Sequence, residues 1–118
     1  MENVTIEATQ NGIWLNGAGR IGKISNCNIY GGSHGINAYL ANLWHIALDI
    51  ENSKISGGVY GIDIWDEAQV NTGSTITFKY DDASVFTGTT NNMKITLQEE
   101  ITCTINGVTQ ETPCDVRS

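Results

Sequence analysis

The sequence predicts an all-β protein, a short parallel β-solenoid of about four coils with an antiparallel hairpin closing its C-terminal end. Three observations support this prediction. Residues 26–38 recur as residues 52–64 with shared residue types in the same places, the apolar residues of each copy alternate, and the 118 residues include 13 glycines and one proline. Internal repeats spaced ~20–50 residues apart are typical of stacked arrays. Alternation and tight glycine turns favour short strands over helices.

The repeat occurs four times. A weaker copy begins at Asn3 and a decayed copy at Asp82, so the leading polar residue falls at positions 3, 26, 52 and 82. We therefore assign residues 1–90 to the coils and residues 91–118 to a C-terminal cap and tail, within a single domain.

Each copy supplies two strands, and a further alternating run at 46–50 and 76–80 precedes each later copy. Coils stacked about 4.8 Å apart place like residues over like and bury a continuous aliphatic core. The residues that we expect to face inward are Val4, Ile6, Cys27, Ile29, Ile36, Ala38, Ser53, Ile55, Ile62 and Ile64.

The turns carry asparagine and glycine at repeating positions. Asn3, Asn26 and Asn52 each precede an inward strand, where asparagine tolerates a left-handed conformation and its amide can bond to the amide of the next coil. Asp82 is predicted to end this ladder. The turns also contain Gly12, Gly35 and Gly61, which are expected to have a positive φ.

Residues 39–47 allow two interpretations. Leu40, Leu43, Trp44 and Ala47 have helical spacing, which allows a short helix bulging from the second coil, whereas a loop is the favoured interpretation. Either interpretation explains why the second repeat is longer than the first.

Beyond residue 90 the pattern changes. Residues 95–98 and 101–105 read as strands, and Asn106-Gly107 is a strong signal for a two-residue hairpin turn. Antiparallel pairing there would close the C-terminal end of the solenoid. The first coil is expected to expose its strand edges unless an upstream segment, another subunit or a different partner covers them.

The Asn-x-x-Ile, Gly-Gly and Gly-Ile pattern of residues 3–90 resembles the right-handed parallel β-helix superfamily, the pectate-lyase-like fold. That superfamily includes polysaccharide lyases, polygalacturonases, alginate epimerases and bacteriophage tailspikes. The resemblance implies a right-handed coil. It says little about activity, because members share the coil and differ in the site.

Charge and composition limit the kinds of binding partner that this protein is expected to have. The formal net charge is −7, which disfavours binding to a phosphate backbone, so nucleic acid is not expected as a partner. No apolar stretch is long enough to insert into a membrane, and no signal peptide is visible. Cys27 and Cys103 are expected to be buried and Cys114 to be reactive, with a Cys103–Cys114 disulfide as an alternative to three reduced thiols.

Outward-facing residues of adjacent coils define the candidate site. Trp14, Asn37 and Asp63 should form one exposed column, and Asn16, Tyr39 and Trp65 the next, with Trp44 as a further contact residue. Indole faces beside amides and carboxylates suit a sugar, although aromatic residues are also enriched in protein interfaces. The site is therefore expected to bind glycan or another subunit.

Catalysis has weaker support. The segment around His34 is similar to the Gly-His-Gly element of polygalacturonases, and Asp81-Asp82 is similar to their paired aspartates. In this sequence, however, the histidine element precedes the aspartates instead of following them. The side chains of two adjacent strand residues also point to opposite faces of the sheet. Asp63, Asp66 and Glu67 are expected to form a solvated acidic face. No cofactor and no metal site are predicted.

The sequence thus predicts a non-catalytic structural or binding module. A phage or viral virion component, such as a tailspike or fibre segment or a capsid-surface protein, is expected, with oligomeric assembly and possible contact with polysaccharide. Its expected location is the virion or the extracellular space after assembly in the cytoplasm. The alternative is a C-terminal fragment of a polysaccharide lyase or glycoside hydrolase.

Overall fold

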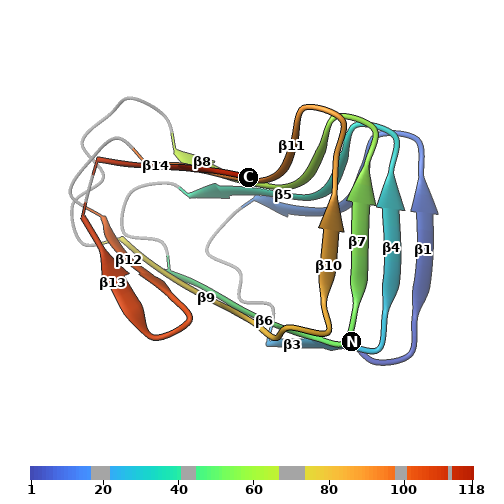
Figure 1. Ribbon diagram of the computed structural model, residues 1–118, viewed down its shortest axis with the longest axis horizontal. Coiled ribbons are helices and arrows are strands. Elements are labelled where there is room, and N and C mark those ends of the chain that lie inside the picture. The colour runs from blue at the N-terminus through green and yellow to red at the C-terminus, as the bar shows by residue number, and fades with distance from the viewer. Residues whose placement is uncertain (17–21, 41–44, 67–73, 98–100, 112) are drawn as a thin grey trace.

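The computed structural model describes residues 1–118 except 17–21, 41–44, 67–73, 98–100 and 112 (Figure 1). The described residues contain strands and turns and no helix, and none of them forms a helix that could span a membrane. The strands are β1 Thr5–Ala8, β2 Asn11–Asn16, β3 Lys23–Ser25, β4 Asn28–Gly31, β5 His34–Leu40, β6 His45–Glu51, β7 Lys54–Gly57, β8 Tyr60–Asp66, β9 Thr75–Tyr80, β10 Val85–Thr87, β11 Asn91–Leu97, β12 Thr102–Ile105, β13 Val108–Gln110 and β14 Cys114–Arg117.

The strands form three sheets that wind into a β-solenoid (Figure 1), which confirms the predicted fold, although it has about three turns where the sequence predicted about four coils. One sheet has the order β1-β4-β7-β10, the second β14-β11-β8-β5-β2 and the third β13-β12-β9-β6-β3. Pairing is parallel wherever successive coils meet. Each of the four sequence repeats therefore contributes one strand to the first sheet.

The core is a set of aliphatic columns, one inside each sheet. Ile29 lies opposite Ile55, and Ile36 opposite Ile62, and all four are fully buried. Burying an isoleucine side chain stabilises the fold by roughly 1.5–3 kcal/mol. The alternation read from the sequence correctly identifies these inward positions, whereas the prediction that Val4 faces inward is wrong, since it is 36% exposed.

The asparagine turns are confirmed. Asn3, Asn26 and Asn52 have φ angles of 55°, 53° and 43°, in the left-handed region. The Asn52 Nδ2 group donates a hydrogen bond of 2.7 Å to Asn26 Oδ1 in the preceding coil. Asparagine thus supplies both the turn conformation and a bond between coils.

The prediction of a positive φ for Gly12, Gly35 and Gly61, the corner glycines between the first and second sheets, is wrong. Among the described glycines only Gly107 has one. Gly35 is required for a different reason: a Cβ added there would lie 2.6 Å from the Gly61 carbonyl oxygen and 2.7 Å from Ile55 Cγ2. The coils approach too closely at this corner for any side chain.

The register of the fourth repeat is shifted by one residue from the predicted alignment. Phe86, and not Val85, lies opposite Ile55. Asp81, and not Asp82, ends the asparagine ladder, because its carboxylate oxygens accept hydrogen bonds of 3.1 Å from the Asn52 backbone N–H. One extra residue in this turn accounts for the shift.

The C-terminal end is closed by antiparallel strands. β12 and β13 form the expected hairpin, with φ angles of 49° at Asn106 and 80° at Gly107. β14 pairs antiparallel with β11, a contact that the sequence did not indicate. β11 and β12 themselves pair parallel with β8 and β9 and continue the coil stack.

The two interpretations of residues 39–47 are partly resolved. Tyr39 and Leu40 end β5, and residues 45–47 begin β6, so the described parts of this segment are strands and a helix over 39–47 is excluded. The remaining residues, Trp44 among them, lie outside the described part of the chain.

At the N-terminal end, β1 and β2 are edge strands. The edge of β3 is not bare, because residues 1–3 run beside it: the Ser25 N–H donates to the Met1 carbonyl oxygen and the Asn3 N–H to the Ser25 carbonyl oxygen, each at 3.0 Å. Among the described residues, β1 and β2 therefore have a neighbouring strand on one side only, whereas residues 1–3 run along the outer side of β3.

All three cysteines are free and buried. Cys27 and Cys103 agree with the prediction, whereas the expectation that Cys114 is open to reaction is wrong, since it is only 6% exposed. Its side chain belongs to the core, at the point where β14 pairs antiparallel with β11 and Cys114 lies opposite Leu97.

Candidate functional site

The candidate site is the outer face of the sheet β2-β5-β8-β11. Trp14 lies opposite Asn37, and Asn37 opposite Asp63, so the first predicted column exists. In the next column Asn16 lies opposite Tyr39, and Tyr39 opposite Trp65. Parallel pairing in this register brings residues 23 or 26 positions apart in sequence onto one surface.

Only part of the first column is exposed. Trp14 is 45% exposed, whereas Asn37 and Asp63 are 8% and 7% exposed. The expectation of a fully exposed column is therefore wrong. The reason is lateral packing: the Trp65 and Tyr39 rings, with centroids 4.6 Å apart and planes tilted by 39°, lie beside Asn37, and His34 contacts Asp63.

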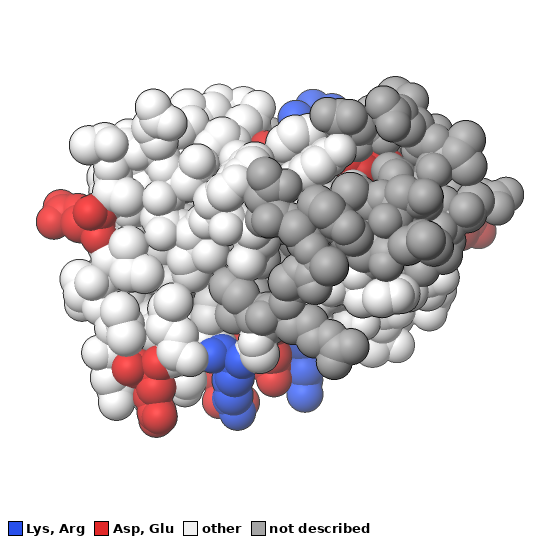
Figure 2. Space-filling view, turned by 180° about the vertical axis from the view of Figure 1, so that it is seen from behind, with Lys and Arg blue, Asp and Glu red and all other residues white. Residues whose placement is uncertain are grey.

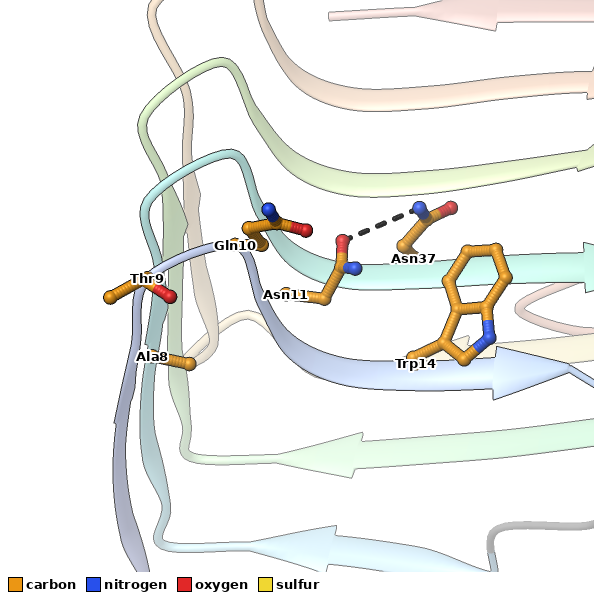
Figure 3. A pocket seen from close by; sticks show the side chains of 6 residues that line it. All are labelled: Ala8, Thr9, Gln10, Asn11, Trp14 and Asn37. Carbon is orange, nitrogen blue, oxygen red and sulfur yellow. Dashed lines mark hydrogen bonds between the residues drawn. The ribbon is translucent and has the colours of Figure 1, made fainter.

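A shallow pocket of about 550 Å³ opens where the turn after β1 rises beside this face (Figure 3). The Trp14 ring forms one wall, and the Asn11 and Asn37 side chains point toward each other beside it. The lining residues are Ala8, Thr9, Gln10, Asn11, Trp14 and Asn37.

A chain of hydrogen bonds underlies this pocket. The Trp65 Nε1–H donates to Asn37 Oδ1 at 2.7 Å, and Asn37 Nδ2 donates to Asn11 Oδ1 at 3.4 Å. These three residues come from three successive coils, on β8, β5 and β2. Asn37 is thus held on both sides and connects the aromatic pair to the pocket.

Further along the face lies a second polar group, centred on Asp63. Its Oδ2 is 3.3 Å from His34 Nε2, and the His34 ring packs against Tyr60 with centroids 5.2 Å apart. Lys94 Nζ lies over the Tyr60 ring, 5.1 Å from its centroid. Burial raises the pKa of Asp63, and the charges of Lys94 and His34 oppose that increase.

The predicted solvated acidic face is not found. Asp63 and Asp66 are both buried, and Glu67 lies outside the described residues. Asp81, the other candidate acid, accepts hydrogen bonds from Ser84 Oγ and the Asn52 backbone and so has a structural role. These carboxylates do not face an open cavity together.

The described residues bear on two kinds of site, a metal site and a catalytic site. No group of three or more His, Cys, Asp or Glu side chains is placed to hold a metal ion. Among these described residues, no serine hydroxyl or cysteine thiol is hydrogen-bonded to His34 or Asp63. What the face offers is an exposed indole beside amide donors and acceptors, which is suited to binding.

The sequence did not identify Asn11, Thr9 and Gln10 as pocket residues. Strict alternation assigns Asn11 to the opposite face from Trp14, but the chain turns at Gly12, where an added Cβ would lie 2.7 Å from the Gly35 carbonyl oxygen. The repeated glycine one residue after Asn11, His34 and Tyr60 is the signal that could have revealed this change of direction. Trp44 lies outside the described residues.

Charge is scarce near the pocket. All six lining residues are uncharged. Seen from behind (Figure 2), the charged side chains of the described residues stand mainly at the margins of the molecule, and the white surface in the left half of the view is uncharged. A ligand of this pocket would therefore be recognised by stacking and hydrogen bonds rather than by ion pairing.

Comparisons of the chain with protein-family models, with curated proteins and with solved structures give no match.

Proposed function

We propose that this protein is a non-catalytic β-solenoid module that binds carbohydrate in the pocket formed by Trp14, Asn11 and Asn37. The observation that carries the proposal is the half-exposed Trp14 ring standing beside two side-chain amides. The apolar face of a pyranose stacks on an indole, while its hydroxyl groups exchange hydrogen bonds with amides.

The shape and position of the site support an extended ligand. The partly exposed rings of Tyr39 and Trp65 continue the aromatic surface from the pocket onto β5 and β8, and each step from strand to strand is about 4.8 Å. A glycan chain lying along the solenoid axis would contact successive coils. Each coil would then contact a further part of the glycan chain.

The resemblance to pectate-lyase-like parallel β-helices, which include phage tailspikes, supports a role in a phage or viral virion. In that role the module would be a tailspike, fibre or capsid-surface segment in an extracellular particle. The repeat motifs Asn-x-x-Ile and Gly-Ile carry this part of the proposal.

A glycan array followed by titration of the best ligand tests the binding proposal. We expect Trp14→Ala to weaken binding at least about tenfold, because an aromatic contact contributes on the order of 1 kcal/mol beyond the buried area. Tyr30→Ala is the matched control, since Tyr30 is 41% exposed on the outer face of β4 and does not line the pocket. Equal binding by wild type and Trp14→Ala, or no bound glycan at all, contradicts the proposal.

The enzyme alternative, a fragment of a polysaccharide lyase or glycoside hydrolase, needs an accessible acid or base. Burial of Asp63 and Asp66 and the structural bonds of Asp81 favour binding over cleavage. Incubation of the bound glycan with the protein, followed by chromatography of the products, separates the two. Shortened or unsaturated products would favour the enzyme.

Contact with other subunits is a second candidate, supported by the edge strands β1 and β2. Unpaired strand edges are able to pair with another chain. Sedimentation over a range of concentrations tests this role. A monomer at the highest concentration would contradict self-association through these edges.

A further inference from the structure

The bond from Trp65 to Asn37 has only one chemically allowed polarity. An indole Nε1–H is a donor and never an acceptor. The Asn37 atom 2.7 Å from it must therefore be Oδ1. This reasoning fixes the orientation of the Asn37 amide without any choice between its oxygen and nitrogen.

The orientation of Asn37 then determines that of Asn11. With Oδ1 turned to Trp65, the group of Asn37 that faces Asn11 is its NH2, which must find an acceptor, and Asn11 Oδ1 lies 3.4 Å away. Asn11 Nδ2 is consequently turned away from Asn37, on the side of the pocket and the Trp14 ring (Figure 3).

We propose that Trp65, through Asn37, holds Asn11 with its NH2 group toward the pocket, and that the pocket therefore selects a neutral glycan presenting an acceptor oxygen next to its stacked face. This inference rests on the proposed carbohydrate binding. Trp65 does not line the pocket and acts as a positioning residue. A flipped Asn11 would offer a carbonyl oxygen to the same ligand atom, and two acceptors facing each other forfeit the hydrogen bond.

The orientation can be tested without a ligand. In ¹⁵N-labelled protein, Trp65→Phe removes the indole donor and keeps an aromatic ring against Tyr39. We expect the side-chain NH2 resonances of both Asn37 and Asn11 to shift, with the backbone spectrum otherwise preserved. Trp14→Phe is the matched substitution, because it changes a ring beside Asn11 and Asn37 outside the hydrogen-bond chain, so the shifts of their NH2 resonances in this variant measure the effect of a changed ring alone. Unchanged Asn11 NH2 resonances in Trp65→Phe overturn the proposal.

The selectivity is tested with methyl glycosides of the sugar bound best on the array. At each hydroxyl, a deoxy analogue removes donor and acceptor, whereas an O-methyl analogue removes only the donor. At the hydroxyl whose oxygen accepts the hydrogen bond from the Asn11 NH2 group, we expect the deoxy analogue to bind about fivefold more weakly and the O-methyl analogue to keep its affinity. In Trp65→Phe the parent glycoside should bind about fivefold more weakly and this difference should disappear.

The outcomes separate the two proposals. If wild type binds none of the glycosides, carbohydrate binding and the selectivity fall together, whatever the spectra show. If wild type binds but deoxy and O-methyl analogues lose affinity equally at every position, binding stands and the donor orientation is wrong. If Trp65→Phe keeps both affinity and selectivity, Trp65 has no positioning role.

Discussion

The side-chain amide of Asn52 donates a 2.7 Å hydrogen bond to the side-chain oxygen of Asn26, one coil earlier, and both residues have left-handed backbone conformations. A left-handed conformation costs most L-residues roughly 1–2 kcal/mol, and asparagine and glycine adopt it more readily. One residue type thus satisfies two requirements of the stacked turn.

We therefore expect Asn52→Ala to lower the free energy of unfolding by about 2 kcal/mol, through backbone conformation and the lost bond together. Asn52→Gly keeps the conformation and loses only the bond, so its loss should be smaller. Urea denaturation of both variants measures the difference. Equal losses would show that the left-handed conformation is not the cause.

Close packing at the corner glycine leads to a second prediction. Gly35→Ala should destabilise the fold by about 2 kcal/mol or more, because its Cβ would overlap the Gly61 carbonyl oxygen and Ile55 Cγ2. Gly35→Val should cost more, and more than Ser33→Val. Gly22→Ala is the control, since nothing lies within 4 Å of its added Cβ. Thermal unfolding that ranks Gly22→Ala with Gly35→Ala would contradict this account.

The pKa of Asp63 gives a pH prediction. Burial raises it in the folded state, so the group favours folding when protonated, below pH 3.8, and this contribution is lost as the pH rises through the folded pKa. Asp63→Asn should therefore increase the free energy of unfolding at pH 7 and change it little at pH 3. An asparagine oxygen can still accept the bond from His34 Nε2.

Denaturant titrations of wild type and Asp63→Asn at both pH values check this prediction, with Asp82→Asn at an exposed position as the control. A stability gain that is the same at pH 3 and pH 7 would mean that ionisation of Asp63 is not responsible. A loss at pH 7 would mean that the bond to His34 outweighs the cost of burial.

The cysteines lead to a prediction about reactivity. Burial, with Cys114 close by, raises the pKa of Cys103 to about 12, and burial also raises the pKa of Cys114. Because the thiolate is the nucleophile, native protein at pH 8 should react with a thiol reagent far more slowly than unfolded protein. Mass spectrometry should find three modified thiols after unfolding in guanidinium. Rapid labelling of Cys114 in native protein would show that the cap opens.

The repeat was sufficient to predict the coil because each inward residue of one copy packs on its counterpart in the next. Ile29 over Ile55 and Ile36 over Ile62 follow directly from aligned copies. Where the copies diverge, the alignment fails: one extra residue before Val85 moves Phe86 over Ile55 and gives the ladder-ending role to Asp81.

The candidate site was predicted less completely. Register alone placed Trp14, Asn37 and Asp63 in one column. Whether a side chain in that column is exposed depends on its lateral neighbours, and the rings of Trp65 and Tyr39 and the imidazole of His34 are brought there by different coils. No spacing in a single copy contains that information.

The sequence by itself determined the all-β solenoid, the inward columns and the left-handed asparagine turns, because these depend on periodicity and on local backbone preference. Only the tertiary structure decided that Cys114 is buried in the core at the start of β14, that the corner glycines are needed for space, and that Asn11 joins Trp14 in a pocket. These features depend on how closely neighbouring coils approach, and the distance between coils is set by packing and not by the order of residues along one strand.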